Sequence, residues 1–369
     1  MPKIRLHVLT TYNSPNSLAL SYPLLINKAF FKAKGIDIHF YDRITNKVHD
    51  CDVIFINGKF FRTWHAEREK ELYNIIAGFK KKTAKVFWFD TTDSTGTTQF
   101  NVMPYVDGYY KNQVLKDRSL YQKVYYGYRI FTEFYKENFG VSDVTESHPD
   151  KAERNKSVAT PLQREHMHKL HISWNTAMND WGSYNFLSGG LIAKIRTYLP
   201  FNTSYTAQFI KADKTRKIDV NGRIGLSHSR DTIKFHRETI VNMLKKFKID
   251  TSRTSRRQYL NEIRNSKIGI SPFGWGEICY RDFELIINGA LLFKADMSHL
   301  KTWPPLYIKD QTYVPYSWSL EDFEQKLRDI LKDKEKIIRV SKKAQELYAY
   351  YLYGNGRLEF CNRVLDIIR

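Results

Sequence analysis

The residue types and spacing that most suggest chemistry occur in one stretch, "SPFGWGEICYRDFE", at 271–284. Gly274 and Gly276 have no β-carbon, so the backbone there can approach a phosphate group closely. The first free N–H groups of a following helix would point at such an anion. Arg281 and Glu284 lie three residues apart and therefore share one face of that helix. We predict that Arg281 meets a phosphate and that Glu284 accepts hydrogen bonds from a ribose diol.

Two structural interpretations compete with this one. The stretch lacks the third glycine of a dinucleotide fingerprint and the Lys-Ser/Thr of a P-loop, so its glycines also fit a tight turn. Arg281 and Glu284 also fit an ordinary surface ion pair, which would contribute little to stability. The apolar strand expected before the loop favours binding, because open α/β sheets bind ligands beyond the carboxyl ends of their strands.

Short apolar runs alternate with longer amphipathic segments in the N-terminal half. We predict strands at 3–9, 36–42, 51–58, 84–90, 105–111 and 168–175, and helices at 14–35, 63–82 and 188–200. Pro23 should kink or split the first of these helices. Strand, helix and strand at this spacing indicate parallel βαβ units. The polar segment 140–166 is expected to form a long loop.

The same alternation restarts after residue 220. We predict strands at 222–227, 267–272 and 291–295, and helices at 232–250, 255–266, 278–290 and within 319–353. The predicted fold class is therefore α/β, with two Rossmann-like, doubly wound domains facing a central cleft and a helical C-terminal tail. We place the domains at 1–200 and 221–340, joined by a linker at 201–220 and followed by a tail at 341–369 that can pack back on the first domain.

A family resemblance rests on "YLNEIRNSKIGISPFGWGEICYRDFELIINGALLFKADMSHL" at 259–300. This block resembles the donor-binding half of GT-B glycosyltransferases, most closely the exostosin-like and CgeB-like groups. The matching positions are Ser266, Pro272, Gly274, Arg281, Glu284, Gly289 and Asp296. The segment "NGRIGLSHSRDTIKFHRETIVNML" at 221–244 is similar to the first strand, loop and Arg-bearing helix of the same domain.

The resemblance implies a nucleotide sugar in the cleft, with its pyrophosphate against Gly274, Gly276 and the helix start and its ribose at Glu284. His228, Arg230 and Arg237 would then add positive charge. The resemblance also implies that no metal cofactor is needed, because helix dipoles and basic side chains stabilise the departing diphosphate. Many retaining members carry two glutamates eight positions apart. Here Glu277 and Glu284 are seven apart, so the stereochemical outcome stays open.

The N-terminal domain would hold the acceptor and, in an inverting enzyme, a general base within hydrogen-bond reach of the acceptor hydroxyl. Asp90 ends a predicted strand and Asp93 lies in the loop beyond it, so we predict one of them as the base. An aspartate at a strand end also commonly caps the following turn, and this alternative stays open. Tyr12 and Asn13 follow the first strand and are predicted to line the acceptor site.

Composition limits the class of protein and its partners. The 369 residues carry a net charge of +20, which favours polyanionic partners and a peripheral attraction to anionic membrane surfaces. Three scattered cysteines without a C-x-x-C pair predict neither disulfides nor a zinc site. His166, His168 and His171 do not share one face of a helix or strand, so they predict no metal site. Without an apolar run long enough for a membrane span, a cytosolic protein is expected.

We therefore predict an enzyme that moves a sugar from a nucleotide-sugar donor to a hydroxyl of a glycan acceptor. Two alternatives come from other classes. A nucleic-acid-binding protein would show its basic residues clustered on one face and a steep salt dependence, but no nucleic-acid-binding module is recognisable. A GT-B-like domain that binds glycans without catalysis would not need Arg281, Glu284 and the glycine loop.

Overall fold

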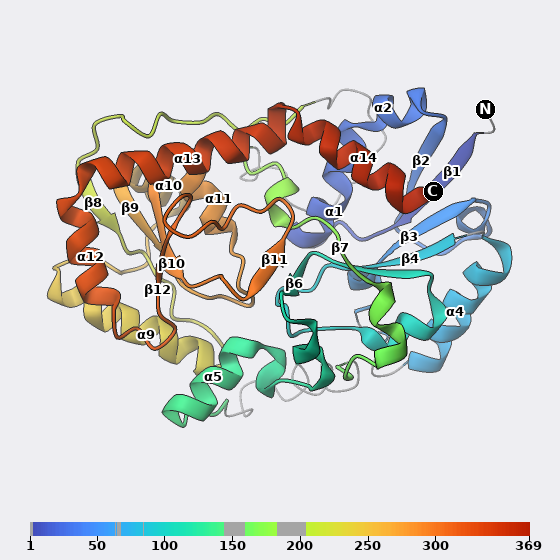
Figure 1. Cartoon of the computed structure of the whole chain (residues 1–369), viewed down its shortest axis with the longest axis horizontal. Coiled ribbons are helices and arrows are strands. Elements are labelled where there is room, and N and C mark those ends of the chain that lie inside the picture. Colours follow the sequence, from blue (N-terminus) through green and yellow to red (C-terminus); the bar gives the residue numbers. More distant parts are fainter. Residues whose placement is uncertain (1–2, 63, 65–67, 84, 144–158, 183–203) are drawn as a thin grey trace.

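The structure is a computed structural model that describes residues 3–62, 64, 68–83, 85–143, 159–182 and 204–369. The predicted helix at 188–200 and most of the predicted loop at 140–166 lie outside the described residues. Two lobes, each built on a parallel sheet, lie side by side along the long axis of the molecule (Figure 1).

The N-terminal lobe contains a six-stranded sheet in the order β2-β1-β3-β4-β5-β7, in which every pairing is parallel. Its strands are β1 (Ile4–Leu9), β2 (Ile36–Tyr41), β3 (Val53–Asn57), β4 (Lys85–Asp90), β5 (Gly108–Lys111) and β7 (Leu170–Ile172). The α-helices of this lobe are α1 (Pro15–Ile26), α2 (Lys28–Ala33), α4 (Glu69–Lys82) and α5 (Ile130–Phe139). The strand order reverses between β1 and β3, and such a reversal leaves a crevice at the carboxyl ends of those strands.

The C-terminal lobe contains a four-stranded parallel sheet in the order β12-β10-β9-β8. Its strands are β8 (Ile218–Asn221), β9 (Ser266–Ser271), β10 (Leu291–Ala295) and β12 (Val314–Tyr316). Its helices are α9 (Asp231–Lys246), α10 (Arg256–Arg264), α11 (Tyr280–Ile287), α12 (Phe323–Lys332), α13 (Lys334–Tyr353) and α14 (Gly356–Ile368). The prediction of an α/β fold with two Rossmann-like parallel sheets and a helical C-terminal tail is confirmed.

Pro23 does not break the first helix where it stands. The helix α1 runs through Pro23 to Ile26, and the break comes at Asn27, before α2. A proline inside a helix leaves the carbonyl four residues earlier without its N–H partner. That carbonyl, of Ala19, instead accepts a hydrogen bond from the indole Nε1 of Trp174 at 3.0 Å. A tertiary contact therefore compensates the proline.

The predicted strand at 222–227 is wrong, because the strand of this region is β8, four residues earlier in the chain. The residues after β8 leave the sheet and run toward the other lobe. Arg223 anchors their start, since its Nε and Nη2 each donate to Glu262 on α10 at 2.8 Å. This pairing joins residues 39 positions apart, and no local pattern indicates it.

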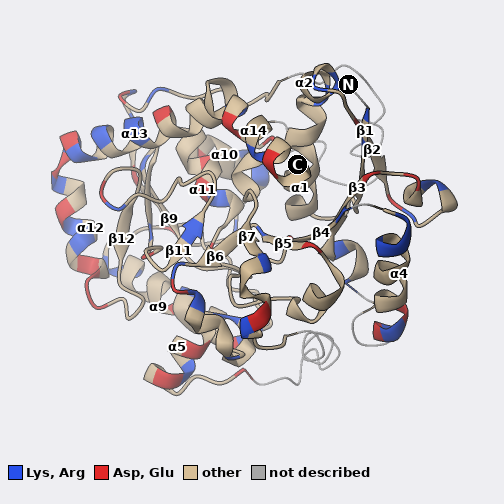
Figure 2. Cartoon of the chain, turned by 45° about the vertical axis from the view of Figure 1, so that its right-hand side comes forward, with Lys and Arg blue, Asp and Glu red and all other residues tan. Residues whose placement is uncertain are grey.

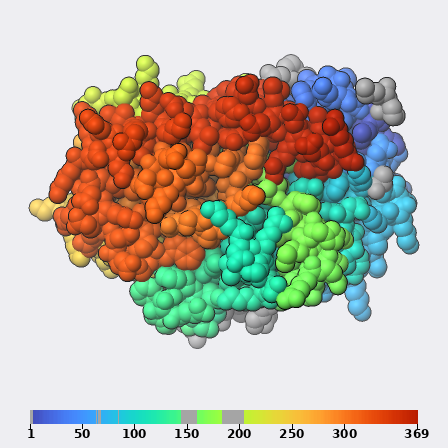
Figure 3. Space-filling view, viewed as in Figure 1, coloured from blue at the N-terminus to red at the C-terminus, as the bar shows by residue number. Residues whose placement is uncertain are grey.

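The two lobes are joined over a broad contact. β6 (Gln113–Leu115) of the N-terminal lobe pairs antiparallel with β11 (Leu300–Thr302) of the C-terminal lobe. The last helix, α14, crosses to the N-terminal lobe, where the ring of Phe360 packs at 4.9 Å from Trp174 (Figures 1 and 3). One hydrophobic core cluster includes residues of β1 and of β9, so the lobes share a core.

Charges are mixed on the visible helices. Figure 2 shows Lys and Arg alternating with Asp and Glu along α12 and α13. On these two helices the charges do not form the single basic face that a nucleic-acid-binding protein would carry. Among the described residues, no helix combines the length and apolar character that crossing a membrane requires.

Candidate functional site

A cavity of 460 Å³ lies between the lobes, at the carboxyl ends of both parallel sheets. Its N-terminal wall comes from the loops after β1, β3 and β4, which meet at the strand-order reversal. Its C-terminal wall comes from the loop after β8, the helix α9, and the loop and first turn between β9 and α11. Ligands bind at this edge in open α/β sheets, so the cavity is the candidate functional site.

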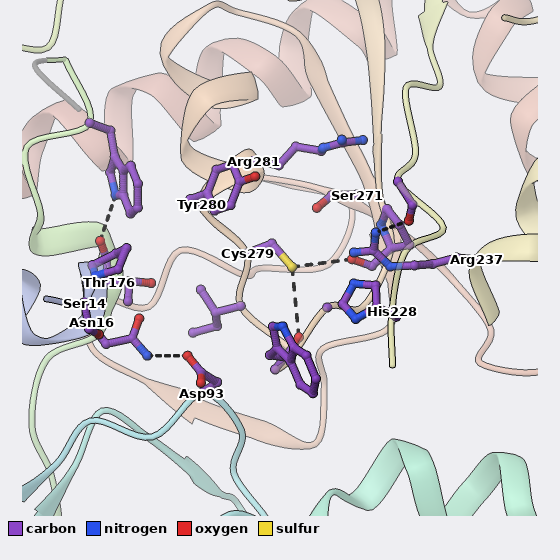
Figure 4. A pocket seen from close by; sticks show the side chains of 18 of the residues that line it. Ser14, Asn16, Asp93, Thr176, His228, Arg237, Ser271, Cys279, Tyr280 and Arg281 are labelled. Atoms are coloured by element: carbon purple, nitrogen blue, oxygen red, sulfur yellow. Dashed lines mark hydrogen bonds between the residues drawn. The ribbon is translucent and has the colours of Figure 1, made fainter. Parts of the chain in front are cut away.

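Asp93 is the carboxylate on the N-terminal wall. Its side chain is 42% exposed, and its Oδ1 accepts a hydrogen bond from Asn16 Nδ2 at 2.6 Å (Figure 4). Lys59 Nζ lies 3.4 Å from the same oxygen. Burial alone would raise the pKa of Asp93, but the positive charges of Lys59 and Arg129 outweigh it and lower the pKa. Asp93 therefore stays ionised at neutral pH.

The opposite side of the cavity carries positive charge. Arg237 on α9 donates from Nε to Phe273 O at 2.7 Å and from Nη1 to Gly225 O at 2.8 Å. Arg281 in the first turn of α11 donates from Nη1 to Ile270 O at 3.2 Å. Neither arginine forms an ion pair with a described residue. In Figure 4, Asp93 lies on one side of the cavity, while Arg281 and Arg237 lie across it.

The N-terminus of α11 adds donors to this wall. Cys279, Tyr280 and Arg281 line the cavity, and the first N–H groups of a helix have no partner within the helix. One of these donors is already used, since the N–H of Cys279 bonds to the carboxylate of Asp282 at 3.1 Å. Burial raises the pKa of the Cys279 thiol, so it stays protonated and is a poor nucleophile at neutral pH.

His228 lines the cavity next to Trp275, with ring centroids 5.3 Å apart. Burial, followed by the nearby charges of Arg237 and Arg129, lowers the pKa of His228 to about 4. His228 is therefore neutral at physiological pH. It can form a hydrogen bond with a ligand, but it does not carry the positive charge that the resemblance to GT-B enzymes implies for this position.

The two predicted glycines both line the cavity but differ in their surroundings. A β-carbon at Gly274 would make only ordinary van der Waals contacts, with Cys279 Sγ at 3.4 Å and Arg237 Nη2 at 3.5 Å. Gly276 is pressed against the backbone of the loop after β4. The lack of a side chain is therefore sterically required at Gly276, where the lobes meet, and not at Gly274.

A second cavity of 370 Å³ adjoins the first, and both include Gly225, Tyr280 and Arg281 in their walls. Four arginines and two tyrosines border it: Arg223, Arg253, Arg256, Arg281, Tyr259 and Tyr280. The arginines of both cavities belong to the C-terminal lobe, and two of them, Arg223 and Arg256, are paired with Glu262 and Glu284.

Several predicted residues lie elsewhere. Asp90 is fully buried, and its Oδ2 pairs with Lys111 Nζ at 2.8 Å, so it lies beneath the cavity wall rather than in the cavity. Tyr12 is buried and Asn13 is exposed, and neither lines the cavity. The neighbouring residues Ser14, Pro15 and Asn16 do line it.

Glu284 and Arg230 are engaged by other residues. Glu284 is 3% exposed and is held by Arg256 and by the hydroxyl of Tyr259, rather than pairing with Arg281. Arg230 donates from Nη1 to Asp143 at 2.9 Å, and Asp143 also accepts the N–H of Thr232. A carboxylate of the N-terminal lobe thus occupies the start of α9, away from the cavity.

Residues that the sequence did not single out complete the cavity. Lys59, Thr176, Trp181 and Trp275 line it from three segments, which follow β3, β7 and β9. Trp275 is 43% exposed. The signal for Trp275 in the sequence is its place in the G-W-G motif. Lys59, Thr176 and Trp181 are brought to the cavity only by the fold. Among the described residues, no group of three or more His, Cys, Asp or Glu side chains could hold a metal ion.

No family model matches this sequence, and no curated protein matches it significantly. An alpha-glucosyltransferase solved with UDP and a DNA containing a HMU base is 11% identical over 99% of both chains, with a TM-score of 0.46. A glycosyltransferase from Rickettsia africae is 10% identical over 100% of this chain and 98% of its own, with a TM-score of 0.45. HepE from Anabaena, solved with UDP, is 10% identical over 99% and 100%, with a TM-score of 0.44. Likeness this distant does not establish a shared family or activity.

Proposed function

We propose that this chain is a metal-independent glycosyltransferase of the GT-B type, which moves a sugar from a nucleotide-sugar donor to a hydroxyl of a glycan acceptor. The observation that carries the proposal is the opposed polarity of the cavity. An ionised carboxylate, Asp93, stands on the wall of one sheet, and Arg237 and Arg281 stand across from it without carboxylate partners. A reaction that removes a proton on one side and releases an anion on the other needs this arrangement.

The size of the space supports a nucleotide sugar. The main cavity, at 460 Å³, falls in the range of roughly 300–1,000 Å³ that is typical of small-molecule sites. The adjoining cavity of 370 Å³ has aromatic and guanidinium groups, against which a nucleobase and ribose can stack and form hydrogen bonds. The diphosphate would then lie beside Gly274, Arg281 and the start of α11.

The residues support the following chemical step. Asp93 accepts the proton of the acceptor hydroxyl while the hydroxyl oxygen forms a bond to the anomeric carbon of the sugar. The bond from that carbon to the diphosphate oxygen breaks, and the electron pair leaves with the diphosphate. Arg237, Arg281 and the N-terminus of α11 stabilise the negative charge that develops there. Asn16 and Lys59 keep Asp93 oriented and ionised before the acceptor arrives.

A thermal-shift screen with UDP-, GDP-, CMP- and dTDP-sugars tests the proposal, since a ligand that binds the native state raises its stability. One nucleotide sugar should raise the melting temperature, by an amount that grows with the logarithm of its concentration above Kd. The R237A and R281A variants should each weaken that nucleotide's affinity by about 10–100-fold, because each loses a charged hydrogen bond to phosphate. The R230A variant is the matched control, because Arg230 directly precedes α9, the helix of Arg237, but is already paired with Asp143.

The screen also separates the alternatives. Full affinity in R237A and R281A would remove the diphosphate from this wall. No shift with any nucleotide sugar, together with a shift by oligosaccharides alone, would favour a glycan-binding protein without transferase activity. Tight binding to nucleic acid that weakens steeply with salt would favour the nucleic-acid alternative.

A further inference from the structure

Glu277 is a buried carboxylate that crosses the boundary between the lobes. It belongs to the loop after β9 in the C-terminal lobe and is fully buried. Its Oε1 accepts hydrogen bonds from Ser94 Oγ at 3.0 Å and from Thr95 Oγ1 at 2.6 Å. Its Oε2 accepts the N–H of Thr95 at 3.2 Å. All three donors lie in the N-terminal lobe, in the two residues that follow Asp93.

Gln113 on β6 extends this network to Asp93 itself. Its Nε2 donates to the carbonyl oxygen of Asp93 at 2.6 Å and to Oε2 of Glu277 at 3.4 Å. The backbone around Asp93 is therefore held at two points. Glu277 holds the next two residues, Ser94 and Thr95, and Gln113 holds the carbonyl oxygen of Asp93 itself. Asn16 and Lys59 hold only the carboxylate end of the side chain. The backbone and the side chain of Asp93 are thus fixed by two separate sets of partners.

Stability alone does not explain a carboxylate at position 277, because the side chain is fully buried. Burying an ionised carboxylate carries a desolvation penalty, which an opposite charge in direct contact usually offsets. Glu277 forms no ion pair within the described part of the chain, and its hydrogen-bond donors are neutral; the positive charge that acts on it comes from the buried Arg129, which does not contact it as an ion pair. A neutral, well-packed residue could join the two loops without that penalty. What the carboxylate adds is two oxygens that together accept four hydrogen bonds, three from Ser94 and Thr95 and one from Gln113.

We propose that Glu277 is a positioning residue that acts across the lobe boundary and sets the place of Asp93 in the cavity. The proposal rests on the proposed function, in which Asp93 accepts the acceptor's proton. Glu277 does not touch the substrates in this account. It makes the loop after β9 and the loop after β4 one rigid unit, so that the place of Asp93 depends on the contact between the two lobes.

The E277Q variant tests this with little change in shape. A Gln side chain keeps one acceptor oxygen, but its amide would face the N–H of Thr95 and the amide of Gln113, which are donors themselves. We expect kcat to fall by about 10–100-fold while KM for the donor changes by less than about threefold, because Arg237 and Arg281 are untouched. The acid limb of the pH–rate profile should also move, since the contact of Asp93 with Asn16 and Lys59 changes.

The control is D322N. Asp322 also accepts a backbone N–H and a hydroxyl, both from Ser317, and is paired with Lys326 at 2.7 Å, but all its contacts lie within the C-terminal lobe. This variant should leave kcat and the pH profile unchanged even where it lowers the melting temperature. The S94A variant should reproduce part of the loss in E277Q, because it removes one of the donors through which Glu277 acts.

Amide hydrogen exchange of residues 92–97 provides a readout that needs no substrate. E277Q should speed exchange in this loop relative to wild type, and D322N should not. Unchanged exchange in E277Q, or a wild-type kcat with a wild-type acid limb, would overturn the positioning role. If the wild-type protein binds no nucleotide sugar but E277Q still loosens residues 92–97, the proposed function fails while the interlobe contact stands.

Discussion

Gly276 lies so close to the loop after β4 that a β-carbon added to it would come within 1.6 Å of the carbonyl oxygen of Asp93. The atoms in the way belong to the backbone and include the N of Ser94 at 3.2 Å. Rotation of a side chain therefore cannot relieve the clash. The second glycine of the G-W-G motif is therefore required by the contact between the lobes. The cavity depends on this contact, because Gly276 and Asp93 both line it.

The G276A variant should accordingly lose both stability and activity. The added methyl group must push the loop of Asp93 away, and overpacking of this kind costs about 1–3 kcal/mol of the free energy of unfolding. Because the displaced residue is the proposed base, kcat should fall further than the loss of folded protein explains. Urea unfolding and initial rates measured on the same preparation check both expectations.

The G274A variant is the control for the same motif. Its new β-carbon would have ordinary van der Waals contact, with Cys279 Sγ at 3.4 Å, so the free energy of unfolding should change little. Donor affinity should fall instead, because the methyl group occupies space beside the proposed diphosphate site. Equal destabilisation by the two substitutions would contradict this division of roles.

The two aspartates near the end of β4 should respond differently to removal of charge. D93N should lower kcat by about 10²–10⁴-fold, the usual contribution of a general base, while the melting temperature stays near that of wild type. The side chain of Asp93 is partly exposed in the cavity, so its neutral amide is well tolerated there. Transfer assays and thermal melts of the purified variant measure the two effects.

D90N is the matched comparison. Asp90 and Lys111 are both fully buried, and Tyr109 also donates to Asp90 at 2.5 Å. Leaving Lys111 without its partner should cost about 3–5 kcal/mol of stability. A D90N protein that folds normally but has no activity would show instead that Asp90, and not Asp93, takes part in the reaction.

The sequence was a good guide to the elements and a partial guide to the site. Strand β10 occupies the predicted residues 291–295, because a short apolar run after a helix leaves few alternatives. Asp93, His228 and Arg281 lie at the cavity because residues that follow parallel strands gather at one edge, and Arg237 reaches it from α9. Their chemical roles remain predictions until the variants are measured.

What the sequence could not reveal was which charged residues are already paired. Arg230 and Asp143 are 87 residues apart, and Glu284 is held by Arg256 on a different helix. Asp90 faces Lys111 only because β4 and β5 pair in that register. Glu277 entered the sequence analysis only through its spacing from Glu284, and its partners lie 164 to 183 positions away. In each case a partner that is distant in the sequence determines whether the charged side chain is available in the cavity.

The pH dependence of the reaction should report on Lys59. Its positive charge helps to lower the pKa of Asp93, so removing it should raise that pKa. The base would then become protonated at a higher pH. We expect K59M to move the acid limb of the kcat profile to higher pH and to leave the rate above neutrality little changed. Rates measured from pH 4 to 8 with a saturating donor test this expectation.

Lys336 offers a control with a similar pairing, since its Nζ lies 3.3 Å from Asp310, in the C-terminal lobe. K336M removes the same charge and should leave the acid limb where it is in wild type. An acid limb that moves equally in both variants would mean that net charge, rather than the contact with Asp93, sets the profile.

His236 should make the protein less stable in acid. It is fully buried on α9, with Nδ1 2.5 Å from the hydroxyl of Tyr135 across the lobe boundary. Burial, followed by the charges of Arg237 and Lys294, lowers its pKa to about 3, against about 6.5 in the unfolded chain. Between these two values the unfolded state binds the proton and the folded state does not. Stability should therefore fall as the pH drops from 6.5, by up to about 1.4 kcal/mol per pH unit.

The H236L variant removes this titration while Tyr135 keeps its hydrogen bond to Trp318 O at 3.0 Å. Its free energy of unfolding, measured in urea at pH 7, 5.5 and 4.5, should decline less steeply than that of wild type. The exposed His168 provides the control, and H168Q should decline as wild type does. A wild-type slope in H236L would mean that other groups carry the acid sensitivity and that the contact of α9 with α5 does not depend on a neutral His236.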